Sequence, residues 1–296
     1  MNLLSLLDQL GIADAPSGAA PRRHLLRQLG QAGARVAAAA LPLALAAPAQ
    51  AAPANTLLDA TLLLLKLEDL LEALYTQALV AAVLTNPAQA AVRPNFERLR
   101  QQQRGHAQFL RTSLSTGGIT PAPAPAFDFS GRKNNAANPV LFPNVMTDYA
   151  AFLQLAQQLE DASASIYLGQ IGFFTADRQL LNAVLRMQTV EARHASHLRT
   201  LRRTAASPLV VKSWPSTADA APNPAVLVPA PAAGSTAPVS IYTFEANETQ
   251  VVSGTNVVPF PTILTGTNAV QFRSFAEAFD EPLPTLQATA LLNIFG

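Results

Sequence analysis

Two stretches that repeat one pattern decide the fold: Leu67-Glu68-Asp69 with Tyr75 seven residues after the Glu, and Leu159-Glu160-Asp161 with Tyr167 seven residues after its Glu. Seven residues are almost two turns of an α-helix, so each Glu shares a helix face with its Tyr. The repeat therefore predicts two related helices that each present an acid and a tyrosine on one face.

Each repeat is followed by a second helical stretch that carries a histidine. The first contains Gln103-Arg104-Gly105-His106-Ala107, and the second contains Glu191-Ala192-Arg193-His194-Ala195. Residues three apart are neighbours on a helix, so Glu191 and His194 face the same way. Together the stretches predict a duplicated helical hairpin, with acids and imidazoles on the inner side of a four-helix bundle. Carboxylate-bridged metal pairs are built at such positions.

The apolar pattern predicts four long helices, which we expect at 56–84, 94–114, 145–174 and 177–203. Connections within each pair are short, whereas a loop rich in Pro, Asn and Gly joins the two pairs over residues 120–143. Two antiparallel hairpins with a long crossover are typical of one class of four-helix bundle. The expected fold class is therefore an all-α core, a four-helix bundle with a long crossover.

The first 51 residues have the order of an export signal. They contain Arg22-Arg23-His24-Leu25-Leu26-Arg27, an uncharged Ala- and Leu-rich run over 36–47, and Ala49-Gln50-Ala51. This order resembles a twin-arginine signal cleaved after Ala51, although the late charge of Arg35 departs from that pattern. The alternative is an uncleaved helix that packs on the body or lies in a membrane. We expect export, to the periplasm or out of the cell.

Residues 205–296 differ from the helical part because they are rich in Pro, Ala and Thr. Short β-like runs are expected at 239–244, 250–252 and 257–263, and short helices at 272–279 and 285–295. The proline density favours an irregular extension around the bundle over an independent domain. The predicted organisation is an export signal at 1–51, a bundle at 55–204 and an extension at 205–296.

Composition excludes several classes of function. The 296 residues have a formal net charge of +1 and only 13% are charged, so no nucleic-acid-binding surface is indicated. The chain has no Cys, so any metal must be held by oxygen and imidazole. It also has no glycine-rich phosphate loop and no Gly-x-Ser-x-Gly motif. After the N-terminal run, no stretch reaches the roughly 18 apolar residues that span a bilayer.

The segment over residues 57–201 is similar to the ferritin-like domain family, which includes bacterial stress-associated and plant desiccation-related proteins. The tail at 278–283, Ala-Phe-Asp-Glu-Pro-Leu, also resembles those chains. In the wider superfamily the di-metal ligands are one Glu from each of the first and third helices and a Glu-x-x-His from each of the second and fourth. The resemblance implies these metal ligands: Glu68, His106, Glu160, Glu191 and His194.

Gln103 departs from that pattern because it stands where the family places a carboxylate. An amide is neutral and binds metal through one carbonyl oxygen, so it bridges two ions poorly. Three states remain open: two iron or manganese ions, a single Fe, Mn or Zn ion, or no ion and a hydrogen-bonded Glu and His network. The last state is costly unless pKa values shift, because three carboxylates would be buried.

Residues next to these positions have two interpretations each. Glu72 is either a substitute ligand or a surface acid. Tyr75 and Tyr167 either donate hydrogen bonds to nearby acids or only pack. Asp69 and Asp161 either orient the histidines as outer hydrogen-bond acceptors or lie on the solvated side.

Three functions are compatible with these features, and the sequence leaves open whether the protein is an enzyme. The preferred hypothesis is an exported, non-catalytic stress or envelope protein with a degenerate metal site and a role in assembly. The alternative is an iron- or manganese-binding oxidase or peroxide scavenger. A carrier of apolar ligands is a third. Self-association is expected from the 49% hydrophobic composition and the extension, and an envelope or extracellular protein is a candidate partner.

Overall fold

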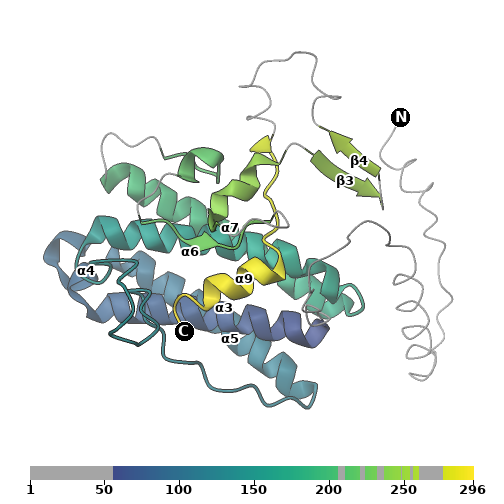
Figure 1. The fold of residues 1–296 in the computed structure, drawn as a ribbon. Coiled ribbons are helices and arrows are strands. Elements are labelled where there is room, and N and C mark those ends of the chain that lie inside the picture. The colour runs from purple at the N-terminus through teal and green to yellow at the C-terminus, as the bar shows by residue number, and fades with distance from the viewer. Residues whose placement is uncertain are drawn as a thin grey trace. The chain divides into compact units, whose positions relative to one another are not determined.

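A computed structural model describes residues 56–205, 211–220, 224–231, 237–247, 249–253, 256–259 and 276–296. The predicted export signal at 1–51 lies outside these residues. Four long helices form the core: α3 (Leu57–Val80), α5 (Arg93–Thr116), α6 (Tyr149–Gln170) and α7 (Arg178–Ala205). Helix α3 packs along α5, α6 packs along α7, and α3 also contacts α6 (Figure 1). The predicted all-α four-helix core is confirmed.

Side-chain caps define where three of these helices begin. Thr56 and Asp59 form a reciprocal capping box at the start of α3, with hydrogen bonds of 3.0 and 3.1 Å. Asp148 accepts a backbone hydrogen bond of 2.9 Å at the start of α6, and Asp177 accepts two of 3.0 Å at the start of α7. Helix α5 instead has Pro94 in its first turn, where proline is tolerated.

The helix predicted at 56–84 is broken at Ala81, which is extended with ψ 165°. A short helix, α4 (Ala82–Thr85), and a 3-10 turn, η1 (Pro87–Gln89), follow the break. The Arg93 guanidinium donates hydrogen bonds from Nη1 to the carbonyls of Leu79 (2.8 Å) and Leu84 (3.2 Å). These bonds satisfy carbonyls that a helix end leaves free, so the chain can turn within an uninterrupted apolar run.

The helix predicted at 145–174 is shorter than expected at both ends. Its first residues form turns that follow Asn144, which has a positive φ of 61°, and α6 begins only after its cap, Asp148. Its last residues form a separate 3-10 helix, η2 (Ile171–Phe174). None of the described helices combines the length and apolar content that crossing a bilayer requires.

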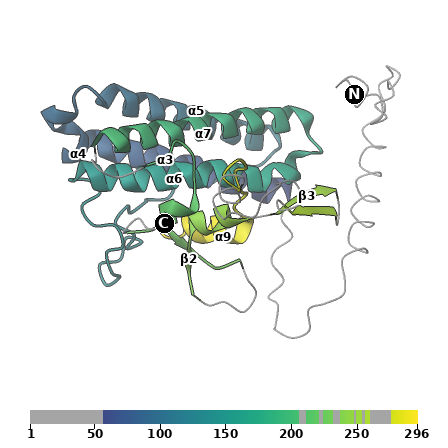
Figure 2. The same ribbon diagram turned by 90° about the horizontal axis from the view of Figure 1, so that it is seen from above.

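The crossover between the two helix pairs packs against the C-terminal residues of the chain. Phe129 and Phe142 of the crossover are buried against Phe295, with ring centroids 5.8 and 5.5 Å from it. The backbone N–H of Asp128 donates a hydrogen bond of 2.8 Å to the carbonyl of Phe295. Helix α9 (Thr285–Leu292), just before Phe295, contacts α3 and α6 (Figure 2). Crossover and C-terminus therefore form one packed layer on the bundle.

The extension contains short elements. Strand β1 (Leu227–Val228) pairs antiparallel with β2 (Val239–Ser240), and β3 (Thr249–Ser253) pairs antiparallel with β4 (Asn256–Pro259). Its described residues also form two 3-10 helices, η3 (Thr217–Ala220) and η4 (Ile241–Ala246). The strand predicted at 239–244 is thus wrong beyond residue 240, because the Ser240 side chain caps η4. Residues 260–263 and the first half of the helix expected at 272–279 lie outside the described part.

One glycine allows the C-terminal segment to approach α6. A Cβ atom on Gly169 would lie 2.3 Å from the carbonyl oxygen of Leu283. The Leu283 N–H also donates a hydrogen bond of 2.9 Å to the carbonyl of Ser165. Glycine is therefore required here for close backbone contact rather than for an unusual φ.

Candidate metal centre

The residues predicted as ligands lie together in the middle of the bundle, and all four helices contribute. Their side chains are buried, and His106 is the most exposed at 15%. Helix α3 supplies Glu68, α5 supplies Gln103 and His106, α6 supplies Glu160, and α7 supplies Glu191 and His194. The duplicated spacing therefore places all six side chains in one cluster.

The charged members of the cluster form two groups that share Glu191. The first triad is Glu68, His106 and Glu191, and the second triad is Glu160, Glu191 and His194. Within each triad the possible ligand atoms lie within 4.8 Å of one another. Glu191 turns Oε1 toward His106 Nδ1, at 2.9 Å, and Oε2 toward His194 Nδ1, at 3.6 Å. A carboxylate with one oxygen in each triad is placed to bridge two sites.

The second triad is filled by the amide of Gln103. Its Nε2 lies 2.9 Å from Glu191 Oε2, 3.1 and 3.3 Å from the two oxygens of Glu160, and 3.4 Å from His194 Nδ1. The amide N–H groups therefore donate to the carboxylates from the position that a cation would take between them. Ser163 adds a hydroxyl hydrogen bond of 3.2 Å to Glu191.

The first triad contrasts with the second because its ligand atoms lack hydrogen bonds. Glu68 Oε2, His106 Nδ1 and Glu191 Oε1 are buried, and none has a partner of hydrogen-bond geometry among the described residues. His106 Nδ1 lies 2.9 Å from Glu191 Oε1 and 3.4 Å from Glu68 Oε2, which is ion-pair distance for a protonated imidazole, but the geometry of a hydrogen bond is not met. Buried polar atoms without partners are rare. The convergence of three such atoms on one point fits the binding of a cation. A ligand set of carboxylate oxygens and an imidazole nitrogen suits iron, manganese or zinc.

Two buried tyrosines hold the acids of α3 and α6 in place. Tyr167 donates a short hydrogen bond to Glu68 Oε1, and Tyr75 donates one of 2.6 Å to Glu160 Oε1. Each tyrosine thus contacts the acid of the other repeat and not its own. Of the two interpretations of these tyrosines, hydrogen bonding to the acids is the observed one.

Burial and mutual charge shift every pKa in the cluster. Burial raises the pKa of Glu68 to about 8 and that of Glu160 to about 7. Burial also opposes charge on the histidines, but the adjacent carboxylates raise the pKa of His106 and of His194 to about 10. Those histidines hold the pKa of Glu191 well below its usual range despite burial. Without metal, the protonated histidines thus largely neutralise the carboxylates at neutral pH.

The aspartates beside the inward acids do not contact the histidines. Asp69 pairs with Arg111 at 2.6 Å, and Asp161 pairs with Arg199 at 2.5 and 3.0 Å. Both interpretations of these aspartates are therefore wrong. The two arginines were not predicted as part of this arrangement, although each lies five residues after the histidine of its repeat and extends the duplication.

Glu72 lies outside both triads. It forms an ion pair with Arg104 on α5, at 2.7 Å, and its side chain is 23% exposed. The surface-acid interpretation therefore fits its position, and the substitute-ligand interpretation does not.

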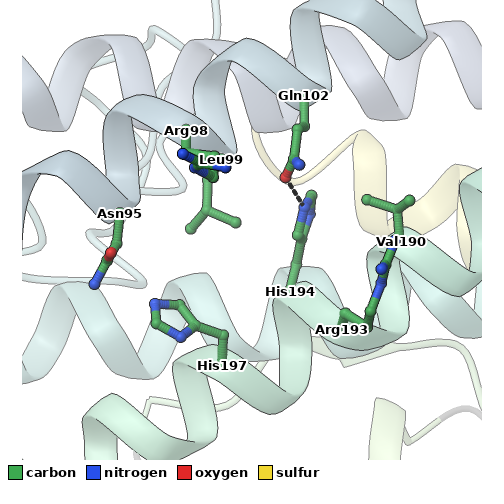
Figure 3. Close-up of a pocket in the computed structure, with 8 residues that line it drawn as sticks. All are labelled: Asn95, Arg98, Leu99, Gln102, Val190, Arg193, His194 and His197. Atoms are coloured by element: carbon green, nitrogen blue, oxygen red, sulfur yellow. Dashed lines mark hydrogen bonds between the residues drawn. The ribbon is translucent and has the colours of Figure 1, made fainter.

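A cavity of about 270 Å³ opens beside the second triad, between α5 and α7. His194 connects the two, because its Nδ1 faces the carboxylates and its Nε2 lies 2.7 Å from Gln102 Oε1 in the cavity wall (Figure 3). The cavity is lined by Asn95, Arg98, Leu99, Gln102, Val190, Arg193, His194 and His197.

Four antiparallel helices with a long crossover and an inward set of Glu and His side chains define the class of carboxylate-type metal-site bundles. Residues 58–204 match the family model described as a ferritin-like domain. Through this segment the chain belongs to the ferritin-like domain family, as the sequence predicted. A search among curated proteins gave no match.

Proposed function

We propose that this protein binds one iron or manganese ion in the first triad and that its role is mainly non-catalytic. The observation that carries the proposal is the position of Gln103. Its amide nitrogen lies among the second-triad atoms, whereas the three ligand atoms of the first triad are buried without hydrogen bonds. The Gln103 amide therefore occupies the position of a second cation and donates hydrogen bonds to the carboxylates that would otherwise bind it.

The balance of buried charge also supports the binding of one ion rather than two. In the metal-free protein the first triad holds protons on Glu68 and His106, whose pKa values are raised to about 8 and about 10. One divalent ion that displaces these two protons leaves the buried charge unchanged. A second ion would displace the Gln103 amide, the His194 proton and, since the pKa of Glu160 is about 7, only part of a proton from Glu160, and so would still add positive charge to a buried cluster. Uncompensated buried charge is expensive.

The residues around the ion have distinct roles in this proposal. Glu68, His106 and Glu191 hold it, and Tyr167 fixes the carboxylate of Glu68. Gln103 keeps the second triad in a hydrogen-bonded state. Bound iron or manganese would supply one-electron redox chemistry, whereas two-electron chemistry is typical of paired ions in this class of bundle.

Manganese titration of chelator-treated protein tests the proposal. We expect one ion per chain, with Glu68→Gln weakening binding by about a hundredfold or more because a charged ligand is lost. Glu160→Gln should change the affinity by less than about threefold, since it alters only the second triad. Glu72→Gln is the matched control, an acid-to-amide change on α3 outside both triads. No binding by the wild type, or equal losses in the Glu68 and Glu160 variants, would refute the one-ion assignment.

The second candidate function is an iron- or manganese-dependent oxidase or peroxide scavenger. The observation in its favour is that Glu191 still places one oxygen in each triad. Oxygen and peroxide consumption by iron-loaded protein, compared with Glu68→Gln, tests it. Turnover that exceeds free iron and disappears in this variant would favour the oxidase, whereas equal rates would favour the non-catalytic role.

We further propose that the protein acts outside the cytoplasm, in the envelope or in stress survival, and that it self-associates. Residues 22–51 support export by their paired arginines, apolar run and small residues. Replacing Arg22 and Arg23 with Lys should retain the full chain in the cytoplasm, whereas the wild-type protein should be exported and begin at Ala52. Light scattering on the exported form checks self-association, and a monomer at all concentrations would contradict it.

A further inference from the structure

We propose that the cavity between α5 and α7 is a binding site for a small organic phosphate. This inference goes beyond the metal site and does not depend on it. Of the residues that line the cavity, only His194 belongs to a triad. The cavity therefore has its own set of side chains, from one face of α5 and one face of α7 (Figure 3).

Charge selects the kind of ligand. Arg98 and Arg193 line the cavity, and neither has an ion-pair partner among the described residues. No Asp or Glu belongs to the cavity lining. Arg104 and Arg111, further along α5, are both paired with acids of α3. Arg100 and Arg186 also have no ion pair among the described residues, but neither lines the cavity. Two guanidinium groups without counter-charges favour an oxyanion, because their fork of donors matches phosphate oxygens.

Neutral donors support the same assignment. His197 Nε2 is buried and has no hydrogen-bond partner among the described residues. It lies on α7 one turn after His194, and Figure 3 shows both rings at the same cavity as Asn95. A bound oxyanion would accept a hydrogen bond from the Asn95 amide, and from His197 Nε2–H once the ring turns so that this covered nitrogen reaches the cavity.

Size and apolar surface indicate an organic phosphate rather than the inorganic ion alone. The volume of about 270 Å³ is just under the roughly 300–1,000 Å³ of sites for drug-sized ligands, and so suits a small metabolite. Leu99 and Val190 add apolar surface on opposite helices. The carbon part of a short phosphate ester would pack against them while its charged end meets the arginines.

Phosphate titrations of metal-free protein at constant ionic strength test the site, with inorganic phosphate and glycerol phosphate as the probes. We expect saturable binding of one glycerol phosphate, and weaker binding of inorganic phosphate. Arg98→Gln and Arg193→Gln should each weaken binding about tenfold or more, because each removes a charged donor. The matched controls are Arg100→Gln on α5 and Arg186→Gln on α7, which lower the net charge equally but lie outside the cavity lining.

The outcomes distinguish specific phosphate binding in the cavity from non-specific attraction of phosphate to positive charge. Equal losses in all four variants, or binding that never saturates, would overturn the proposal. Glycerol phosphate that binds no better than inorganic phosphate would overturn the assignment to an organic ligand. Glu68→Gln should bind phosphate as the wild type does, so a failure of the metal proposal is distinguishable from a failure here.

Discussion

The half of the bundle made by α3 and α5 and the half made by α6 and α7 repeat several polar side chains at matched positions, yet the two halves are not equivalent. Each half has an inward acid, a tyrosine, a histidine and an Asp–Arg pair. Among the six Glu, Gln and His side chains of the cluster, the unmatched position is Gln103 in the first half against Glu191 in the second. Glu191 serves both triads, while Gln103 fills one of them, so a single amide makes a duplicated site asymmetric.

The largest expected difference between the halves concerns their Asp–Arg pairs. Arg199 and Asp161 are almost fully buried, with 0% and 3% of their side chains exposed, whereas Arg111 is 30% exposed. Removing one partner of a buried pair costs about 3–5 kcal/mol. Arg199→Met should therefore lower the free energy of unfolding by about that amount, because it leaves Asp161 and Asp219 without their shared partner. Arg111→Met leaves only Asp69, whose side chain is 7% exposed, and should cost less. Urea denaturation measures both.

The only tryptophan helps to interpret this pair of variants. Arg199 also donates a hydrogen bond of 2.9 Å to the carbonyl of Trp214 and pairs with Asp219, so it ties the extension to α7. We expect the Trp214 fluorescence of Arg199→Met to change at lower urea than helical circular dichroism does. Equal destabilisation by the two methionine variants would mean that burial does not distinguish the halves. Arg186→Met, an exposed change on α7, is the control.

The next largest effect should come from restoring symmetry. Gln103→Glu places a carboxylate opposite Glu191, so the second triad gains a charge and loses the amide donor. We expect manganese stoichiometry to rise from one to two ions per chain, with affinity for the second ion increased about tenfold or more. Isothermal titration measures this. Gln101→Glu, an exposed change on the same helix, should remain at one ion, and an unchanged stoichiometry in Gln103→Glu would contradict the asymmetry.

A smaller difference is expected between the two tyrosines. The hydrogen bond from Tyr167 is the one that Glu68 receives from the described residues, whereas Glu160 receives bonds from Gln103 as well as Tyr75. Tyr167→Phe should therefore destabilise the metal-free protein by about 1–2 kcal/mol, and Tyr75→Phe by less. Thermal unfolding compares the two. A larger loss in Tyr75→Phe would indicate that Gln103 does not support Glu160.

Much of this arrangement could be predicted from local sequence. The seven-residue and three-residue spacings fix which side chains face inward, and caps such as Asp148 and Asp177 mark helix starts, because both depend only on nearby residues. The repeat then places Glu68, His106, Glu160, Glu191 and His194 in one cluster. Their role as ligands remains a prediction.

Features that depend on distant contacts could not be predicted in the same way. The break at Ala81 is stabilised by Arg93. Arg199 pairs with Asp219, and Tyr242 donates a hydrogen bond of 2.6 Å to Asp161, the other partner of Arg199. The orientation of the Gln103 amide depends on two carboxylates from other helices. In each case the stabilising group is supplied by tertiary packing, which local spacing does not encode.

The smallest expected effect concerns the protonation of the first triad and its dependence on pH. The folded-state pKa of Glu68 is raised to about 8 from 4.5, and that of His106 to about 10 from 6.5. A raised pKa contributes stability below the unfolded value and loses it as pH rises through the folded value. The metal-free protein should therefore lose this contribution between pH 4.5 and about 8 through Glu68, and between pH 6.5 and about 10 through His106.

A bound ion replaces those protons, so its binding should strengthen over the same range, by at most about tenfold per pH unit for each proton displaced. The rise in Tm caused by manganese should therefore grow from about pH 6 to about pH 8. Glu72→Gln should show the same growth, while Glu68→Gln should show little shift at either pH. If the shift instead shrinks as pH rises, the ion is not competing with protons at the first triad, and its ligands must lie elsewhere in the chain.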